Sequence, residues 1–212
     1  MQSRPMFGSF GDWCSATIRH KLLRKSCEPD YLLELGRLKH ARHIPKRIQK
    51  YFDQMTRELK GMDFVESFHA TVAALGPFST ATLGMSRKDG EVHFFATQIV
   101  TQVERQIEDE CYFGFISWRR EAGSFWSLSP HRVPNPRSEV QRVTVNSDKP
   151  REVLRKHRER IRGEQPKVVR PIDYFESYHR EHAKQVKDWT QRGVIRVATP
   201  AEVTRVRNQI DV

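Results

Sequence analysis

The chain has 212 residues, of which 37% are hydrophobic and 30% charged, and its formal net charge is +11. This hydrophobic content is sufficient for a folded core, and no run of about 20 predominantly apolar residues is present that would cross a membrane. The three cysteines show no paired spacing, so we expect neither a disulfide framework nor a zinc site, and a reducing compartment, the cytoplasm, is favoured.

A basic N-terminal helical segment is predicted for residues 1–60. One helix is expected over 13–25 after a capping Asp12, and a second over 30–40 after Pro29. A third is predicted by five apolar side chains at helical spacing. These side chains are Ile44, Ile48, Phe52, Met55 and Leu59.

The hydrophobic period then changes to the alternation typical of strands, which predicts an α+β domain over 61–212 with its sheet between residues 64 and 145. Asp89-Gly90 indicates a hairpin turn. The acidic stretch 104–110 is expected to interrupt the sheet. Strands are predicted over 64–72, 80–86, 91–100, 111–119, 124–128 and 140–145.

Helical patterns return in the last third of the chain. They predict helices over 149–162, 172–192 and 200–210, with a short strand over 194–197. Aromatic side chains on both sides of the strand at 112–118 indicate a sheet covered on both faces. The predicted fold class is therefore α+β, with a central, mostly antiparallel sheet of about five to six strands packed by helices.

Positive charge is concentrated towards the two ends of the chain. Residues 1–60 carry 13 basic and 6 acidic side chains, residues 61–145 carry 8 and 10, and residues 146–212 carry 16 and 10. Lysine and arginine at this density neutralise phosphates and release counterions, which gives nucleic-acid affinity without sequence preference. The residues expected to bind an anionic partner are Arg37, Lys39, Arg42, Lys46, Arg47, Lys50, Arg155, Arg158 and Arg162.

Solvated helix faces in a basic protein explain the same pattern. The choice between this interpretation and an anion-binding site depends on whether the basic segments share one face. We expect a non-enzymatic binding module for an anionic partner, with nucleic acid favoured. One alternative is a protein-interaction or scaffolding domain that meets an acidic protein surface. The other is a small-molecule binder or hydrolytic enzyme with a deep pocket lined by His93, Tyr112 or Trp126.

Two local patterns are similar to known sites but incomplete. Residues 113–118 resemble the RNP1 core of RRM domains, in which aromatic side chains stack on RNA bases, yet a strand follows where that fold has a helix, so core packing is favoured. His179 and His182 share a helix face, but zinc needs three or four ligands, so no metal and no cofactor is predicted. No catalytic motif is present, and no catalytic residue is assigned.

A wider resemblance covers residues 60–200. The stretch from Val92–Phe95 to Phe125–Trp126, followed by the helix that ends at Trp189–Gly193, resembles a family of uncharacterised bacterial proteins. The resemblance implies an α+β fold and carries no activity, cofactor or partner.

Overall fold

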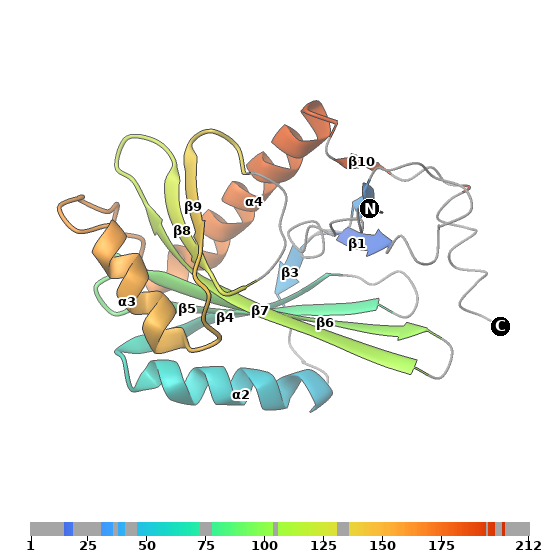
Figure 1. Ribbon diagram of the computed structural model, residues 1–212, viewed down its shortest axis with the longest axis horizontal. Coiled ribbons are helices and arrows are strands. Elements are labelled where there is room, and N and C mark those ends of the chain that lie inside the picture. The colour runs from blue at the N-terminus through green and yellow to red at the C-terminus, as the bar shows by residue number, and fades with distance from the viewer. Residues whose placement is uncertain are drawn as a thin grey trace.

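The computed structural model describes residues 15–18, 31–35, 38–40, 46–72, 78–103, 106–130, 136–193, 195–197 and 201. Its centre is a seven-stranded sheet in which strands adjacent in the sequence are also adjacent in space (Figure 1). Each pair is antiparallel except the last, which is parallel. The strands are β3 (Leu38–His40), β4 (Phe64–Val72), β5 (Phe78–Arg87), β6 (His93–Val103), β7 (Gln106–Trp118), β8 (Ser124–Leu128) and β9 (Val140–Thr144).

Helices cover both faces of this sheet. Helices α2 (Lys46–Lys60) and α3 (Pro150–Arg160) pack on one face. The opposite face is covered by α4 (Tyr174–Gln191), which follows a short 3-10 turn, η2 (Pro171–Asp173). Figure 1 shows α2 and α4 on opposite sides of the strands. The predicted α+β class, with a mostly antiparallel sheet packed by helices, is confirmed, and β3 brings the number of strands to seven.

The core under α2 follows from the period of its sequence. Ile48, Phe52, Met55 and Leu59 recur every three or four residues, and all four are buried. Such a stripe covers one side of a helix and is stable only when it packs against another apolar surface. The sheet supplies that surface with alternate side chains of its strands, for example Phe94 on β6. The helix predicted over this stretch is therefore confirmed.

The opposite face is closed by aromatic side chains. Tyr174 and Tyr178 of α4 lie with their rings 5.1 and 5.4 Å from that of Phe68 on β4. Phe95 of β6 points to this side while its neighbour Phe94 points to the other, because side chains alternate along a strand. A strand that is buried on both faces needs apolar residues at both parities, which explains the adjacent aromatic residues Phe94–Phe95 of β6 and Tyr112–Phe113 of β7.

Two of the predicted N-terminal helices are wrong in the part that the structure describes. In place of the helix over 13–25, β1 (Ser15–Ile18) is a strand, and the segment 30–40 contributes β2 (Tyr31–Leu35) and β3. Strands β1 and β2 form a three-stranded sheet with β10 (Ile195–Val197), which confirms the short strand predicted over 194–197. Pairing with distant partners outweighs weak local helix propensity here.

The acidic stretch 104–110 does not interrupt the sheet as predicted, since β7 begins at Gln106. In the backbone register, acidic residues of β7 pair with uncharged residues of β6, for instance Glu110 with Ile99 and Asp109 with Val100. Backbone pairing therefore continues without repulsion between facing like charges. The helix expected over 200–210 lies outside the described residues apart from Ala201.

Candidate functional site: an arginine-lined cleft

A cleft of about 340 Å³ opens where the C-terminal end of α3 meets the β5–β6 hairpin and the segment 161–170. Backbone hydrogen bonds join this segment to the sheet: the Lys167 N–H donates to the Trp118 carbonyl at 2.8 Å, and the Val169 N–H to the Gly90 carbonyl at 2.9 Å. The charged side chains that line the cleft are Arg87, Arg120, Arg158, Arg162, Glu91 and Glu164. Four cations and two anions therefore converge on one concave site.

Positive charge is only partly compensated in the cleft. Arg87 pairs with Asp89 at 3.0 Å. Burial lowers the pKa of Arg158, and the neighbouring Arg87 lowers it further, while Asp89 and Asp63 act in the opposite direction. Among the described residues, no salt bridge is formed by Arg120, Arg158 or Arg162. An arginine whose pKa is lowered by another arginine is a site where a bound anion would be stabilising.

Apolar side chains form the rest of the wall. Val168 is 57% exposed, and Pro166 lies near it in the same segment. Gly90 adopts a φ of 73° in the hairpin turn, and a Cβ there would lie 2.7 Å from the Val169 carbonyl oxygen. Glycine is thus needed both for the turn and for the close approach of the segment that carries Val168.

Two of the predicted anion-binding residues, Arg158 and Arg162, line this cleft. Arg155 is exposed on α3 and pairs with Glu159. Lys46 and Lys50 are exposed at the start of α2. Lys39 lies in β3 and Arg47 in α2, whereas Arg37 and Arg42 lie outside the described residues.

The two basic helices lie on the same face of the sheet but do not form one continuous patch. The charge of Asp63, which follows the C-terminal end of α2, raises the pKa of Arg158. With a rise of 1.5 Å per residue, Lys50 is about 15 Å from Lys60 along the helix axis, and Lys46 is further still. The lysines at the start of α2 and the arginines of the cleft are therefore separate positive regions.

Sequence reasoning missed Arg87 and Arg120. Both belong to the central part of the chain, where acidic residues outnumber basic ones. Arg87 ends β5 and Arg120 follows β7, so their proximity to α3 is created by the fold and leaves no local signal in the sequence.

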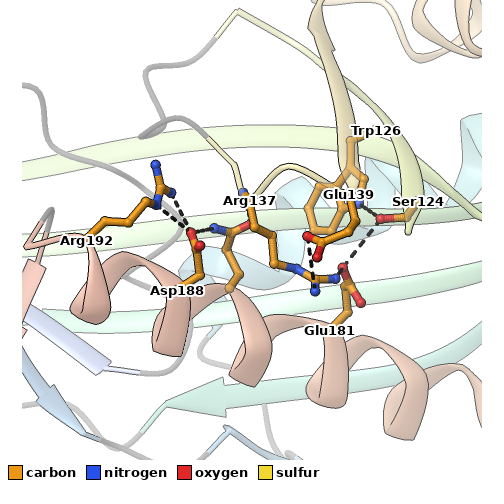
Figure 2. Close-up of polar contacts among 8 residues, drawn as sticks. Ser124, Trp126, Arg137, Glu139, Glu181, Asp188 and Arg192 are labelled. Carbon is orange, nitrogen blue, oxygen red and sulfur yellow. Dashed lines mark hydrogen bonds and ion pairs between the residues drawn. The ribbon is translucent and has the colours of Figure 1, made fainter. Parts of the chain in front are cut away.

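A second polar cluster lies between β8 and α4, and Figure 2 shows it to be internally paired. The Trp126 indole N–H donates to Ser124 Oγ at 2.7 Å, and this hydroxyl donates to Glu181 Oε1 at 3.5 Å. Glu181 also forms an ion pair with Arg137, whose guanidinium lies 3.8 Å from Glu139.

This cluster extends along α4 without opening a site. The backbone N–H of Arg137 donates to Gln185 Oε1 at 3.3 Å. The adjacent cavity, which Gln185 and Trp189 line, measures about 10 Å³, near the lower limit for one water molecule. A cavity of that size cannot take a substrate, so the cluster serves to hold the segment around Arg137 against α4.

Two buried histidines are likewise fully engaged. Ser117 donates its proton to the Glu91 carbonyl at 2.7 Å, so it accepts from Nε2–H of His157, and Nδ1 of that ring accepts from Ser127, both at 3.0 Å. Burial lowers the pKa of His157 to about 3 and that of His93 to about 4. Both rings are neutral and inaccessible, which is unlike a general base that must reach a substrate.

The deep pocket considered from the sequence is filled. His93, Tyr112 and Trp126 are at most 3% exposed, and the His93 ring lies 4.9 Å from Trp118 and 4.6 Å from Tyr174. These side chains belong to the packed core under α4 and leave no room between sheet and helix for a ligand.

The RNP1-like segment is also part of the core. Phe113 and Phe115 are buried beneath α2 and α3, while Tyr112 and Trp118 are buried beneath α4. Stacking on RNA bases requires aromatic rings on an open sheet face. The rings of this segment are covered by helices, so they pack the core, as the sequence favoured.

The histidine pair of α4 is divided between two environments. His182 is buried, and the His179 ring stacks on Phe175 at 6.1 Å. Within the described ranges, no group of three or more His, Cys, Asp or Glu side chains is arranged to hold a metal ion. In the same part of the chain, none of the helices is long and apolar enough to cross a membrane.

Comparison with known proteins finds no relative of this chain. No protein-family model matches the chain, and neither a curated protein nor a solved structure does so.

Proposed function

We propose that this protein is a non-enzymatic binding module for nucleic acid, which contacts phosphates through the arginine-lined cleft. The observation that carries the proposal is the convergence of four arginines from three segments of the chain on one concave site. Three of them form no salt bridge within the described part of the chain. Lys46 and Lys50 add exposed charge on the same face of the sheet, whereas the charge of Arg155 is paired with Glu159.

Guanidinium groups suit this role for two reasons. Each presents a planar fork of N–H donors that matches two phosphate oxygens, and each stays charged at any physiological pH. The same permanence makes arginine unsuitable as an acid or base, so the four cations of the cleft favour binding over proton-transfer chemistry.

The proposal is tested by fluorescence anisotropy of labelled single- and double-stranded DNA and RNA over a series of salt concentrations. We expect log affinity to fall steeply with log salt, with a slope of about 0.9 per phosphate contact on duplex DNA. The double variant R158Q/R162Q is expected to bind more weakly and to lower the magnitude of that slope by about 1.8. Both side chains are exposed, so we expect the double variant to keep the fold.

A matched control removes two exposed charges elsewhere. Lys184 and Lys187 lie on α4, on the opposite side of the sheet. K184Q/K187Q changes the net charge by the same amount and is expected to retain the wild-type slope. Equal losses in the two double variants would mean that binding follows total charge and not the cleft. No binding at low salt would refute the proposal and favour a protein-interaction domain.

A further inference from the structure

We propose that the cleft seats the terminal phosphomonoester of a nucleic-acid strand, in preference to the bridging phosphates along it. This inference rests on the proposed function and narrows it to one chemical group. It follows from the charge, the size and the lining of the cleft.

The charge of the site favours a dianion. A bridging phosphodiester carries one negative charge, whereas a phosphomonoester carries about 1.5 to 2 at neutral pH. Arg158 and Arg87 line the cleft together, and the Arg87 charge lowers the pKa of Arg158. Arg162 and Arg120 add two further cations, while Glu91 and Glu164 contribute two anions, so four cations less two anions leave the lining side chains with a formal net charge of +2. A dianion offsets two guanidinium groups at once, so it gains more from this arrangement than a monoanion does.

The size and lining of the cleft favour a strand end. At about 340 Å³, it lies near the lower limit of the range of about 300–1,000 Å³ in which proteins bury small ligands. It therefore suits a single terminal group better than a run of backbone phosphates. The exposed Val168 and the nearby Pro166 offer an apolar surface beside the arginines, where the sugar and base attached to the phosphate would pack.

The test compares single strands of one sequence that carry an internal dye and end in a 5′-phosphate, a 3′-phosphate or hydroxyls alone. We expect at least one phosphorylated strand to bind about tenfold more tightly than the hydroxyl strand, a difference typical of one strong charge-assisted contact. R158Q/R162Q should abolish this preference and K184Q/K187Q should retain it. Adenosine monophosphate should displace the phosphorylated strand, whereas adenosine should not.

A pH series gives an independent measurement. The second proton of a phosphomonoester binds with a pKa of about 6, so the preference should shrink as the pH falls below that value. Affinity for the hydroxyl strand should change little over the same range, because bridging phosphates remain monoanions.

The possible failures are distinguishable. If all three strands bind equally and R158Q/R162Q weakens them equally, the terminal phosphate is excluded while the nucleic-acid proposal stands. If a preference exists but survives in R158Q/R162Q, the cleft is not its site. If no strand binds at low salt, both proposals are refuted.

Discussion

Glu181 illustrates, at the scale of single residues, how much a buried charge depends on its partner. Its side chain is 7% exposed and pairs with Arg137, which is 14% exposed. Replacement by glutamine keeps the volume but removes the buried counterion of Arg137 and leaves only the half-exposed Glu139, 3.8 Å away. Loss of one partner of a buried ion pair typically costs about 3 kcal/mol. We therefore expect E181Q to lower the free energy of unfolding, measured in urea, by about that amount.

The exposed pair of Arg155 and Glu159 provides the comparison, because both side chains are about half exposed. Solvent screens such a pair, so its loss changes stability little. E159Q should therefore be close to wild type. Similar losses in E181Q and E159Q would show that the cluster in Figure 2 contributes no more to stability than the exposed pair of Arg155 and Glu159.

His157 leads to a prediction about pH. Its pKa is lowered to about 3 by burial first and by the Arg160 charge second, whereas the unfolded chain has an ordinary histidine pKa near 6.5. Below that value the unfolded state binds a proton that the folded state refuses, so stability falls as the pH falls. His93, with a pKa of about 4, acts in the same direction.

The difference in proton binding between the folded and unfolded states sets an upper limit on this loss of stability. Once the unfolded form is protonated, each of the two histidines lowers the free energy of unfolding by at most about 1.4 kcal/mol for every pH unit by which the pH falls. We expect urea unfolding to show a decline between pH 6 and pH 5 and H157Q to be less stable but to decline less steeply. An unchanged slope in H157Q would mean that His157 takes up a proton in the folded state as readily as in the unfolded one.

At the scale of elements, the contact between β4 and β5 depends on a glycine. A Cβ on Gly84 would lie 2.2 Å from Phe68 Cε1. The Phe68 ring is fixed by Tyr174, Phe175 and Tyr178, so it cannot move aside without disturbing η2 and α4. Overpacking of this kind costs about 1–3 kcal/mol, and we expect G84A to reach the upper part of that range in urea unfolding.

Gly61 is the matched control for this substitution. A Cβ there has only the Glu58 carbonyl oxygen near it, at an ordinary contact distance of 3.5 Å. G61A should therefore leave the unfolding midpoint close to that of wild type. A G84A midpoint as high as that of G61A would mean that the β4–β5 packing tolerates an added methyl group.

Elements with a strong local period could be predicted from the sequence. The apolar stripe of α2 and the Asp89-Gly90 turn both depend on residues within a short window, and both are confirmed. β1 and β2 were missed because a strand is stabilised by partners far away, such as β10 for β2. A short apolar segment is compatible with a helix or a strand. The strand with which it would pair lies far away in the sequence, so the local pattern cannot decide between the two.

At the scale of the whole molecule, the candidate site is a product of the fold. More than 30 residues separate Arg87 from Arg120, and more than 30 separate Arg120 from Arg158. The three arginines meet because β5, β7 and α3 terminate at the same end of the sheet. The sequence identified Arg158 and Arg162 through the charge density of one helix. It contained no signal for the other two arginines, since convergence of isolated charges depends on topology and not on spacing.

This convergence leads to a prediction for the stability of the whole protein. An anion that binds only the folded state raises the free energy of unfolding by RT ln(1 + [L]/Kd), about 1.4 kcal/mol at ten times Kd. For a chain of this size, 1 kcal/mol corresponds to about 2–4 °C in Tm. We expect inorganic phosphate to raise Tm above its value in chloride of equal ionic strength. General exclusion of phosphate from protein surfaces contributes to every variant alike, so the informative quantity is the difference between variants. Phosphate should raise the Tm of K184Q/K187Q as much as that of wild type, and should raise the Tm of R158Q/R162Q less. An equal increase in Tm in both variants would mean that phosphate stabilises the protein through its overall charge and not through the cleft.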